Sequence, residues 1–314
     1  MFINRIYYYI KPFIPRACQI TLRRHITLRK RSKYNHIWPI DPSAGKQPEG
    51  WPGWPDQKQF ALVLQHDIDT QKGHDKCNEL LALEESLGFR SLFSFVPERY
   101  NVSESLRNDI LNKGFDIGVH GLKHDGKLFV SKKIFQNRAP RINKYLKEWN
   151  SVGFSSPSMH HNLDWMHLLT IKYDISTFDT DPFEPQPDSV RTIFPFWVQG
   201  SSNTNGYVEL PYTLPQDHGL FIIMRERTID IWKKKLDWIA EKGGMVLLNS
   251  HPDYMNFCGR KFSIEEYPVK YYEDFLEYIK SKYAGQYWHV LAKDMARFWS
   301  ESMVQKSESG PPPD

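Results

Sequence analysis

Three clusters of acidic and histidine side chains each follow directly after an apolar run of the sequence. The clusters are Asp67 with Asp69, His120 with His124, and His251 with Asp253. One carboxylate and two imidazoles form a ligand set that suits Zn²⁺ or another first-row divalent ion. Carboxylates and imidazoles also act as general bases and general acids. The clusters therefore predict a metal site with proton-transfer groups beside it, provided that the fold brings them together.

The spacing within the clusters suggests individual roles. His120 and His124 are four residues apart, so one helical turn or a tight loop can aim both rings at one point. The nearby Gly121 and Gly126 favour a bent loop over a regular helix. Asp69 is the candidate third ligand, and three protein ligands leave open positions for water and substrate, as a catalytic metal site requires.

The remaining two groups are candidates for proton transfer. Asp67 lies two residues before Asp69 and is a candidate general base, while His251 follows a different strand and is a candidate general acid. Each pattern taken alone has an ordinary structural explanation, because aspartates cap helices and order loops. Their occurrence together, each where a strand ends, favours the metal-site interpretation.

The elements that must position these clusters alternate between strand and helix patterns from about residue 58 to residue 300. Expected strands are 60–64, 91–96, 115–119, 245–248 and 287–291, and expected helices are 74–87, 103–113, 131–149, 232–239 and 271–279. This alternation predicts a parallel sheet with helical crossovers, either open or closed into a barrel. In such folds the carboxyl ends of the strands lie on one face, which holds the active site. Residues 180–227, rich in proline and aromatics, are interpreted as a long insertion near one mouth of the sheet.

Three motifs in this order resemble the NodB-type polysaccharide deacetylase family. They are His66-Asp67-Ile68-Asp69, His120-Gly121-Leu122-Lys123-His124 and Asn249-Ser250-His251. The resemblance covers about residues 58–300 and implies a distorted (β/α) barrel, usually seven-stranded, that removes acetyl groups from sugars with a divalent metal, for which we favour Zn²⁺. It also implies that Asp67 is the base, that Asp69, His120 and His124 are the metal ligands, and that His251 is the acid. One residue separates the two aspartates, and in this spacing the chain resembles a D-x-D subgroup of the family.

The chain departs from the family pattern in two further motifs. Ser155 stands where the third motif usually has an arginine that orients the base, and a neutral serine cannot supply a charged bidentate grip. Asn249 stands where the last motif usually has leucine. The fourth motif is represented only by the candidates Asp174, Asp179 and Asp181.

The substrate implied by the resemblance is an acetylated sugar or glycan precursor, as in the biosynthesis of surface polysaccharide. We name Ser155, His160 and Trp197 as candidate substrate-binding residues. Aromatic side chains of the 180–227 stretch could stack on sugar rings, or they could simply pack that stretch onto the barrel. Two other functions stay open: a catalytically impaired glycan-binding or assembly protein on the same scaffold, and a hydrolase of another non-peptide C–N bond, such as that of a cyclic ureide.

Composition limits the class of protein further. Of the 314 residues 40% are hydrophobic, which is enough to bury a sizeable core and excludes a wholly disordered chain. No run approaches the roughly 18 apolar residues of a membrane-spanning helix, and the start lacks a signal-peptide pattern. The three cysteines are scattered and form neither a disulfide framework nor a metal-binding pair. We therefore expect a cytoplasmic protein.

Charge is distributed unevenly along the chain. Residues 1–40 contain nine Lys or Arg and no Asp or Glu, so the other 32 basic and 37 acidic residues leave a net charge of −5. We divide the chain into a basic arm and Trp/Pro-rich linker (1–57), a barrel (58–304) and a disordered tail (305–314). The arm, residues 1–34, is interpreted first as a folded extension with solvated charges, and second as a contact with the inner face of an anionic membrane. No nucleic-acid partner is expected, because no recognised nucleic-acid fold accompanies it.

Overall fold

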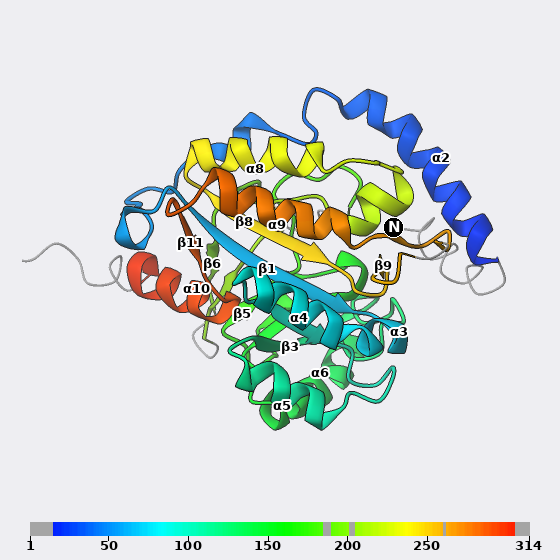
Figure 1. Cartoon of the computed structure of the whole chain (residues 1–314). Helices are drawn as coiled ribbons and strands as arrows, with labels where there is room; N and C mark the ends of the chain where they lie inside the picture. The colour runs from blue at the N-terminus through cyan, green and yellow to red at the C-terminus, as the bar shows by residue number, and fades with distance from the viewer. Residues whose placement is uncertain (1–14, 185–189, 201–204, 260–261, 305–314) are drawn as a thin grey trace, which may run out of the picture.

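A curled, mostly parallel sheet forms the centre of the molecule, as the computed structural model shows for residues 15–184, 190–200, 205–259 and 262–304 (Figure 1). The strands of this sheet are β1 (Phe60–Ile68), β2 (Leu92–Phe95), β3 (Asp116–His120), β4 (Gly153–Ser155), β5 (Tyr173–Asp174), β6 (Phe196–Val198), β7 (Tyr207–Glu209), β8 (Met245–Ser250) and β11 (Tyr287–His289). The predicted tail 305–314 and the first part of the predicted arm lie outside the described residues.

The strand order curls the sheet into a distorted barrel. Within the described residues, β8-β1-β2-β3-β4-β5-β7 are parallel neighbours, β11 pairs with the start of β1, and β6 runs antiparallel to β7. Just beyond β7, the backbone N–H groups of Thr213 and Leu214 each donate to the carbonyl of Leu247 on β8 at 3.2 Å. These bonds draw the two ends of the curl together, so the predicted distorted (β/α) barrel is confirmed.

Helices surround the sheet and connect its strands (Figure 1). They are α2 (Arg16–Tyr34), α3 (Gln71–Asp75), α4 (Cys77–Leu87), α5 (Glu104–Asn112), α6 (Lys132–Glu148), α7 (Leu163–Met166), α8 (Asp230–Lys242), α9 (Lys270–Lys282) and α10 (Ala292–Trp299), with the short turns η2 (Pro42–Gly45), η3 (Pro55–Gln57), η4 (Pro157–Met159), η5 (His218–Ile223) and η6 (Ser300–Val304). A separate pair, β9 (Met255–Asn256) and β10 (Tyr267–Pro268), follows β8. The expected helix 74–87 is divided at Lys76, and the expected cap Ser103 accepts a hydrogen bond from the N–H of Leu106.

Burial explains the apolar strand runs. Every residue of β1 and of β8 is buried, as expected for strands covered on both faces. Side chains alternate across a strand, so Gln65 and Asp67 share one face of β1 and His66 takes the other. On that other face, His66 Nε2 lies 2.9 Å from Glu84 Oε1 of α4, which ties the first motif to the surrounding helices.

The interpretation of residues 180–227 as an insertion was wrong in part. β7 lies in this stretch and pairs with β5 in parallel, so it belongs to the barrel wall, and β6 extends the same sheet. Both strands are three residues long. A strand of that length is too short for an alternating pattern to reveal.

The N-terminal part of the described chain packs onto the barrel. Residues 16–34 form the helix α2, which lies on the side toward which β1 and β8 point (Figure 1). The buried Arg24 donates from Nε to the carbonyl of Ile222 in η5 at 2.8 Å and from a terminal nitrogen to the carbonyl of Ile264 at 3.2 Å. Trp54 is 5% exposed and donates to the carbonyl of Gly243, so the Trp/Pro-rich linker is fastened to the body. None of the described helices is long and apolar enough to cross a membrane.

Candidate metal centre and active site

Three of the predicted residues meet at the carboxyl ends of β1 and β3. Ligand atoms of Asp69, His120 and His124 all lie within 4.8 Å of one another. Asp69 Oδ1 is 2.9 Å from His124 Nε2 and 3.5 Å from His120 Nε2. The two strands are brought together by β2, which pairs with both of them in parallel. Residues that are about 50 positions apart in the sequence therefore converge because of the strand order.

The histidine pair is carried by a bent loop, as the flanking glycines predicted. Gly121 has a φ of +61° and its N–H donates to the carbonyl of Ser155 at 3.0 Å. A side chain at this position would start 2.5 Å from the ring of Pro157, so only glycine fits. His124 has a φ of +52°, which turns the chain back and lets both imidazoles face Asp69.

The donor set fits a divalent cation. Asp69 Oδ1 is buried and faces the Nε2 atoms of His124 and His120. His120 Nδ1 lies 2.6 Å from Ser155 Oγ, so its Nε2 is the free nitrogen and faces Asp69. A second partner of this kind fixes ring orientation and tautomer in metal sites. Burial by itself raises the pKa of Asp69, but His124 and His120 outweigh it and hold that pKa well below the usual range. The carboxylate is thus ionised and ready to ligate.

Asp67 lies beside this triad without belonging to it. Its Oδ1 is 3.2 Å from His120 Nδ1, the nitrogen that faces away from Asp69. Three neutral side chains donate to its carboxylate, namely Gln65, Ser155 and Asn249. Among the described residues no Lys or Arg nitrogen lies within 4.0 Å of it. The position that the third motif usually gives to arginine is therefore filled by a serine that contacts both Asp67 and His120.

His251 forms an ion pair with an aspartate that the sequence did not reveal. His251 Nδ1 donates to Asp217 Oδ1 at 2.7 Å, and the backbone N–H of His251 donates to Asp217 Oδ2 at 2.8 Å. Tyr267 donates to the same Oδ2 at 2.9 Å. Burial opposes a charge on His251, but Asp217, with smaller contributions from Asp69 and Asp67, raises the pKa of His251 to about 10. The imidazole is therefore protonated at neutral pH and can donate a proton from Nε2.

The three candidates for the fourth motif do not contact His251. Asp174 lies against Glu209 on the neighbouring strand, and burial next to that carboxylate raises its pKa well above the usual range. Asp179 pairs with the buried Lys235 at 2.6 Å. The pKa of Asp181 is raised to about 6 by burial. The aspartate that orients the histidine is Asp217, which lies in the stretch taken for an insertion.

The candidate substrate-binding residues lie in different places. Ser155 is 1% exposed and sits between Asp67 and His120, whereas His160 and His124 line the same small pocket. Trp197 on β6 lines a separate groove that it shares with residues of η2, α10 and η6. Binding of substrate by any of the three stays a prediction.

Comparisons with known proteins bear on the fold of the chain. No model of a known protein family matches the sequence, and no curated protein matches it. Solved structures do match. One provisionally assigned as a polysaccharide deacetylase from Mycobacterium smegmatis is 16% identical with a TM-score of 0.62, and the match covers 83% of this chain and 96% of that one. Another so assigned, from Pseudomonas aeruginosa PAO1, is 15% identical with a TM-score of 0.63, covering 85% and 99%.

A third structure, PuuE allantoinase, is 14% identical with a TM-score of 0.62, and the match covers 85% of this chain and 98% of that one. The chain has the fold of the polysaccharide deacetylases. The resemblance that the motifs indicated is thus confirmed at the level of the fold, while the D-x-D subgroup stays a prediction.

Proposed function

We propose that the protein is a metal-dependent hydrolase of a non-peptide C–N bond and that it removes the N-acetyl group of a sugar or glycan precursor. The observation that carries this proposal is the meeting of Asp69, His120 and His124 at one point, with Asp67 beside them. The protonated His251 supports it, since a general acid must hold a proton. The fold that the chain shares with the polysaccharide deacetylases also supports the proposal.

The roles of the side chains follow from their positions. Asp69, His120 and His124 would hold a divalent cation, whose Lewis acidity would make water easier to deprotonate and would stabilise negative charge on a carbonyl oxygen. Asp67 accepts the proton of the water that attacks the acetyl carbonyl. His251 donates its Nε2 proton to the departing sugar amine, which is a poor leaving group until it is protonated. Asp217 keeps His251 charged and oriented.

The test is acetate release from a panel of N-acetylated sugars, measured with purified protein loaded in turn with Zn²⁺, Co²⁺ and Mn²⁺. We expect release that depends on added metal and that chelation abolishes. Zn²⁺ is our first choice because two imidazoles and one carboxylate are typical of its catalytic sites. Asp67→Asn should keep bound metal and lose activity, whereas full turnover by that variant would refute the assignment of the base.

A second candidate function is hydrolysis of a cyclic amide or ureide. The specific observation in its favour is the equally good match in fold to PuuE allantoinase. Both reactions break a non-peptide C–N bond with water, and the substrate distinguishes them. Including allantoin and related cyclic ureides in the panel separates them. The alternative of a catalytically impaired glycan-binding protein predicts metal and glycan binding without hydrolysis of any member.

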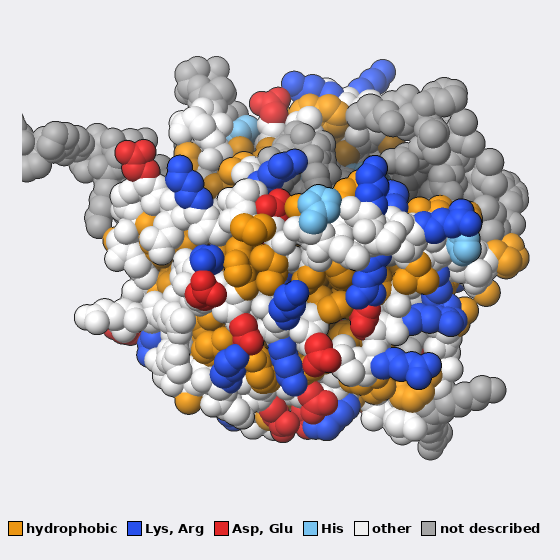
Figure 2. All heavy atoms as spheres, turned by 90° about the horizontal axis from the view of Figure 1, so that it is seen from above, with side chains coloured by type: hydrophobic (Ala, Val, Ile, Leu, Met, Phe, Trp, Pro, Cys, Tyr) orange, Lys and Arg blue, Asp and Glu red, His pale blue; other side chains and the backbone are white. Residues whose placement is uncertain are grey.

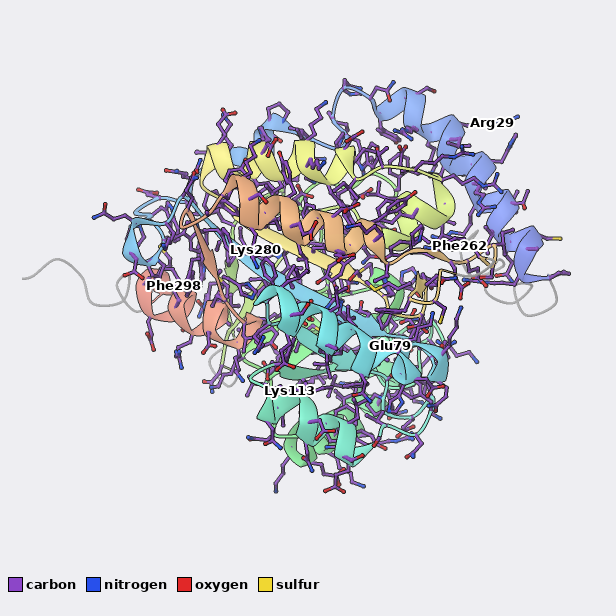
Figure 3. All side chains as sticks on the ribbon, in the orientation of Figure 1. Arg29, Glu79, Lys113, Phe262, Lys280 and Phe298 are labelled. Atoms are coloured by element: carbon purple, nitrogen blue, oxygen red, sulfur yellow. The ribbon has the colours of Figure 1, made fainter. Side chains whose placement is uncertain are left out.

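We also propose that α2 contacts an anionic membrane surface at the inner face of the membrane, where a lipid-linked sugar precursor for surface polysaccharide would be presented. α2 contains no acidic residue, and Leu22, Ile26, Arg29 and Lys33 follow one another at spacings of four, three and four residues. Leu22 is 51% exposed and Ile26 is 46% exposed. Arg29 points away from the body (Figure 3). Apolar and basic groups on one outward stripe suit the surface of an anionic bilayer.

The surroundings of α2 agree with such a contact. The exposed Phe262 lies next to the N-terminal part of the helix (Figure 3), and Ile264, whose carbonyl accepts from Arg24, is exposed as well. Figure 2, which looks down on the face that carries α2, shows Lys and Arg side chains interspersed with hydrophobic and some acidic ones.

Co-sedimentation with liposomes tests this contact. We expect binding to vesicles that contain phosphatidylglycerol, weak binding to pure phosphatidylcholine, and loss of binding in the double variant Leu22→Ser with Ile26→Ser. Leu111→Ser is the matched control, because Leu111 is an exposed leucine of α5. Equal binding by the double variant and the wild type would refute the proposed contact while leaving the hydrolase unaffected.

A further inference from the structure

We infer that Gln65 and Asn249, together with Ser155, position the base Asp67 through neutral hydrogen bonds in place of a charged partner. This inference rests on the proposed hydrolase function, because a base has a role only if the site carries out the reaction. It assigns positioning roles to Gln65, which no motif of the sequence pointed to, and to Asn249, which the sequence marked only as a departure from the family pattern.

The three donors divide the carboxylate of Asp67 between them. Gln65 Nε2 donates to Oδ1 at 2.8 Å and Ser155 Oγ donates to the same oxygen at 3.1 Å. Asn249 Nδ2 donates to Oδ2 at 2.7 Å. Contacts from both ends fix the plane of the carboxylate as well as its position. They also leave Oδ2, with a single donor, as the oxygen that has a lone pair free to accept a proton.

Strand register places these donors. Gln65 of β1 and Asn249 of β8 are direct partners in the parallel pairing of the two strands, and Ser155 of β4 is the partner of His120. Gln65 precedes Asp67 by two residues, so their side chains share a face of β1. Both amide residues are fully buried and Asp67 is 2% exposed. The hydrogen bonds between these amides and Asp67 are therefore shielded from bulk water.

The NH₂ groups of both amides donate to Asp67, and within the part of the chain that the structure describes their carbonyl oxygens are left without a partner. Gln65 Oε1 and Asn249 Oδ1 are buried and have no hydrogen-bond partner among the described residues. An ionised carboxylate only accepts hydrogen bonds, so each amide must turn its NH₂ group toward it. The second contact of Gln65, at 3.0 Å from its Nε2 to the hydroxyl of Tyr212, supports the same orientation. Each amide thus leaves its carbonyl unbonded, at a cost in stability, to serve the carboxylate.

A neutral set of donors has a chemical consequence. A guanidinium would bring a full positive charge into a site that already has a protonated His251 and a place for a cation. The amides supply orientation without that charge. Asn249, at the position where the resemblance leads us to expect leucine, donates to the same carboxylate as Ser155, which stands where an arginine is expected.

The experiment compares two variants that keep shape and remove the donor, Asn249→Leu and Gln65→Met, with the wild type. For each protein we would measure bound metal, thermal unfolding, and kcat and KM on the substrate that the panel identifies. We expect each variant to bind metal as the wild type does, with kcat about 10- to 100-fold lower, the range for loss of one hydrogen bond to a charged group, and KM changed less than about 3-fold. In the double variant the combined loss should fall short of the product of the two single losses, because both amides act on one carboxylate.

Ser94→Ala is the matched control. Ser94 is the register partner of Asp67 on β2, and its hydroxyl is buried without a hydrogen-bond partner among the described residues. Its kcat should stay within about 2-fold of the wild type. The inference is overturned if either amide variant keeps more than half of the wild-type kcat, or if activity is lost only in step with bound metal or with folding. A wild type that hydrolyses no member of the panel overturns the proposed function itself, and this result appears before any variant is compared.

Discussion

Replacing Asp217 by asparagine should convert His251 from an imidazolium into a neutral imidazole over most of the physiological pH range. In the native structure Asp217 lies 2.7 Å from His251 Nδ1, and it outweighs burial to raise the pKa of His251 to about 10. Without that carboxylate, burial is the largest remaining influence and lowers the pKa toward or below the ordinary value of about 6.5. A bound cation offsets the charge of Asp69, so that residue cannot restore the shift.

The size of the effect follows from the fraction of His251 that is protonated. A group with a pKa of about 6.5 is roughly 3% protonated at pH 8, whereas a group with a pKa near 10 is almost wholly protonated. A reaction that needs the proton of His251 should therefore slow at least about 30-fold at pH 8 in Asp217→Asn. At pH 5.5 most of the histidine regains its proton, and the difference should shrink to a few-fold.

The assay is a profile of kcat against pH from 5 to 10, with bound metal measured at each point. The wild type should keep its activity to a more alkaline pH than the variant, because Asp217 holds the proton of the acid at His251 Nδ1 and the variant lacks that carboxylate. Asp230→Asn, which removes the same charge from the start of α8, is the control and should leave the profile unchanged. An alkaline limb that does not move in Asp217→Asn would refute the assignment of His251 as the acid held by Asp217.

Three further predictions test other parts of the structure. Asp69→Ala should lose bound metal and hydrolysis together, as metal analysis and acetate release would show; retained metal would contradict the ligand assignment. Lys235→Met should lower the free energy of unfolding by about 3–5 kcal/mol near pH 7, because it leaves the buried Asp179 unpaired. Burial already raises the pKa of Asp179, so the stability of this variant should recover as pH falls and the carboxyl is protonated. A free energy of unfolding that does not change with pH would contradict this role of Asp179. Trp54→Ala should destabilise the fold by about 3–5 kcal/mol, since the indole is buried and donates to Gly243; an unchanged unfolding midpoint would show that the linker is not fastened to the barrel.

The parts of the fold with strong local signals were predictable from the sequence. The continuous apolar runs of β1 and β8 indicate strands that are buried on both faces. Gly243 ends α8 in the left-handed conformation expected of a glycine at the C-terminal end of a helix. The metal triad was predictable as well. Asp69 follows the apolar run of β1, the two histidines follow that of β3, and the carboxyl ends of parallel strands lie on one face.

Other parts depend on contacts that no local pattern encodes. Asp217 lies 34 positions before His251, after a strand too short to recognise, and meets it only because the chain beyond β7 joins β8 through Leu247. The positions of Gln65 and Asn249 are set by strand register, which a single sequence does not specify. Such side chains become recognisable only when the barrel has brought them around Asp67.

The most direct test of the central claim is an X-ray crystal structure of the zinc-loaded protein with anomalous diffraction recorded at the zinc edge. We expect one strong anomalous peak at roughly 2.0–2.2 Å from a carboxylate oxygen of Asp69 and from Nε2 of both His120 and His124. Asp67 and His251 should face the open side of that peak without binding to it. No peak at this position after loading with excess zinc, or a peak bound by other residues, would refute the proposed metal centre.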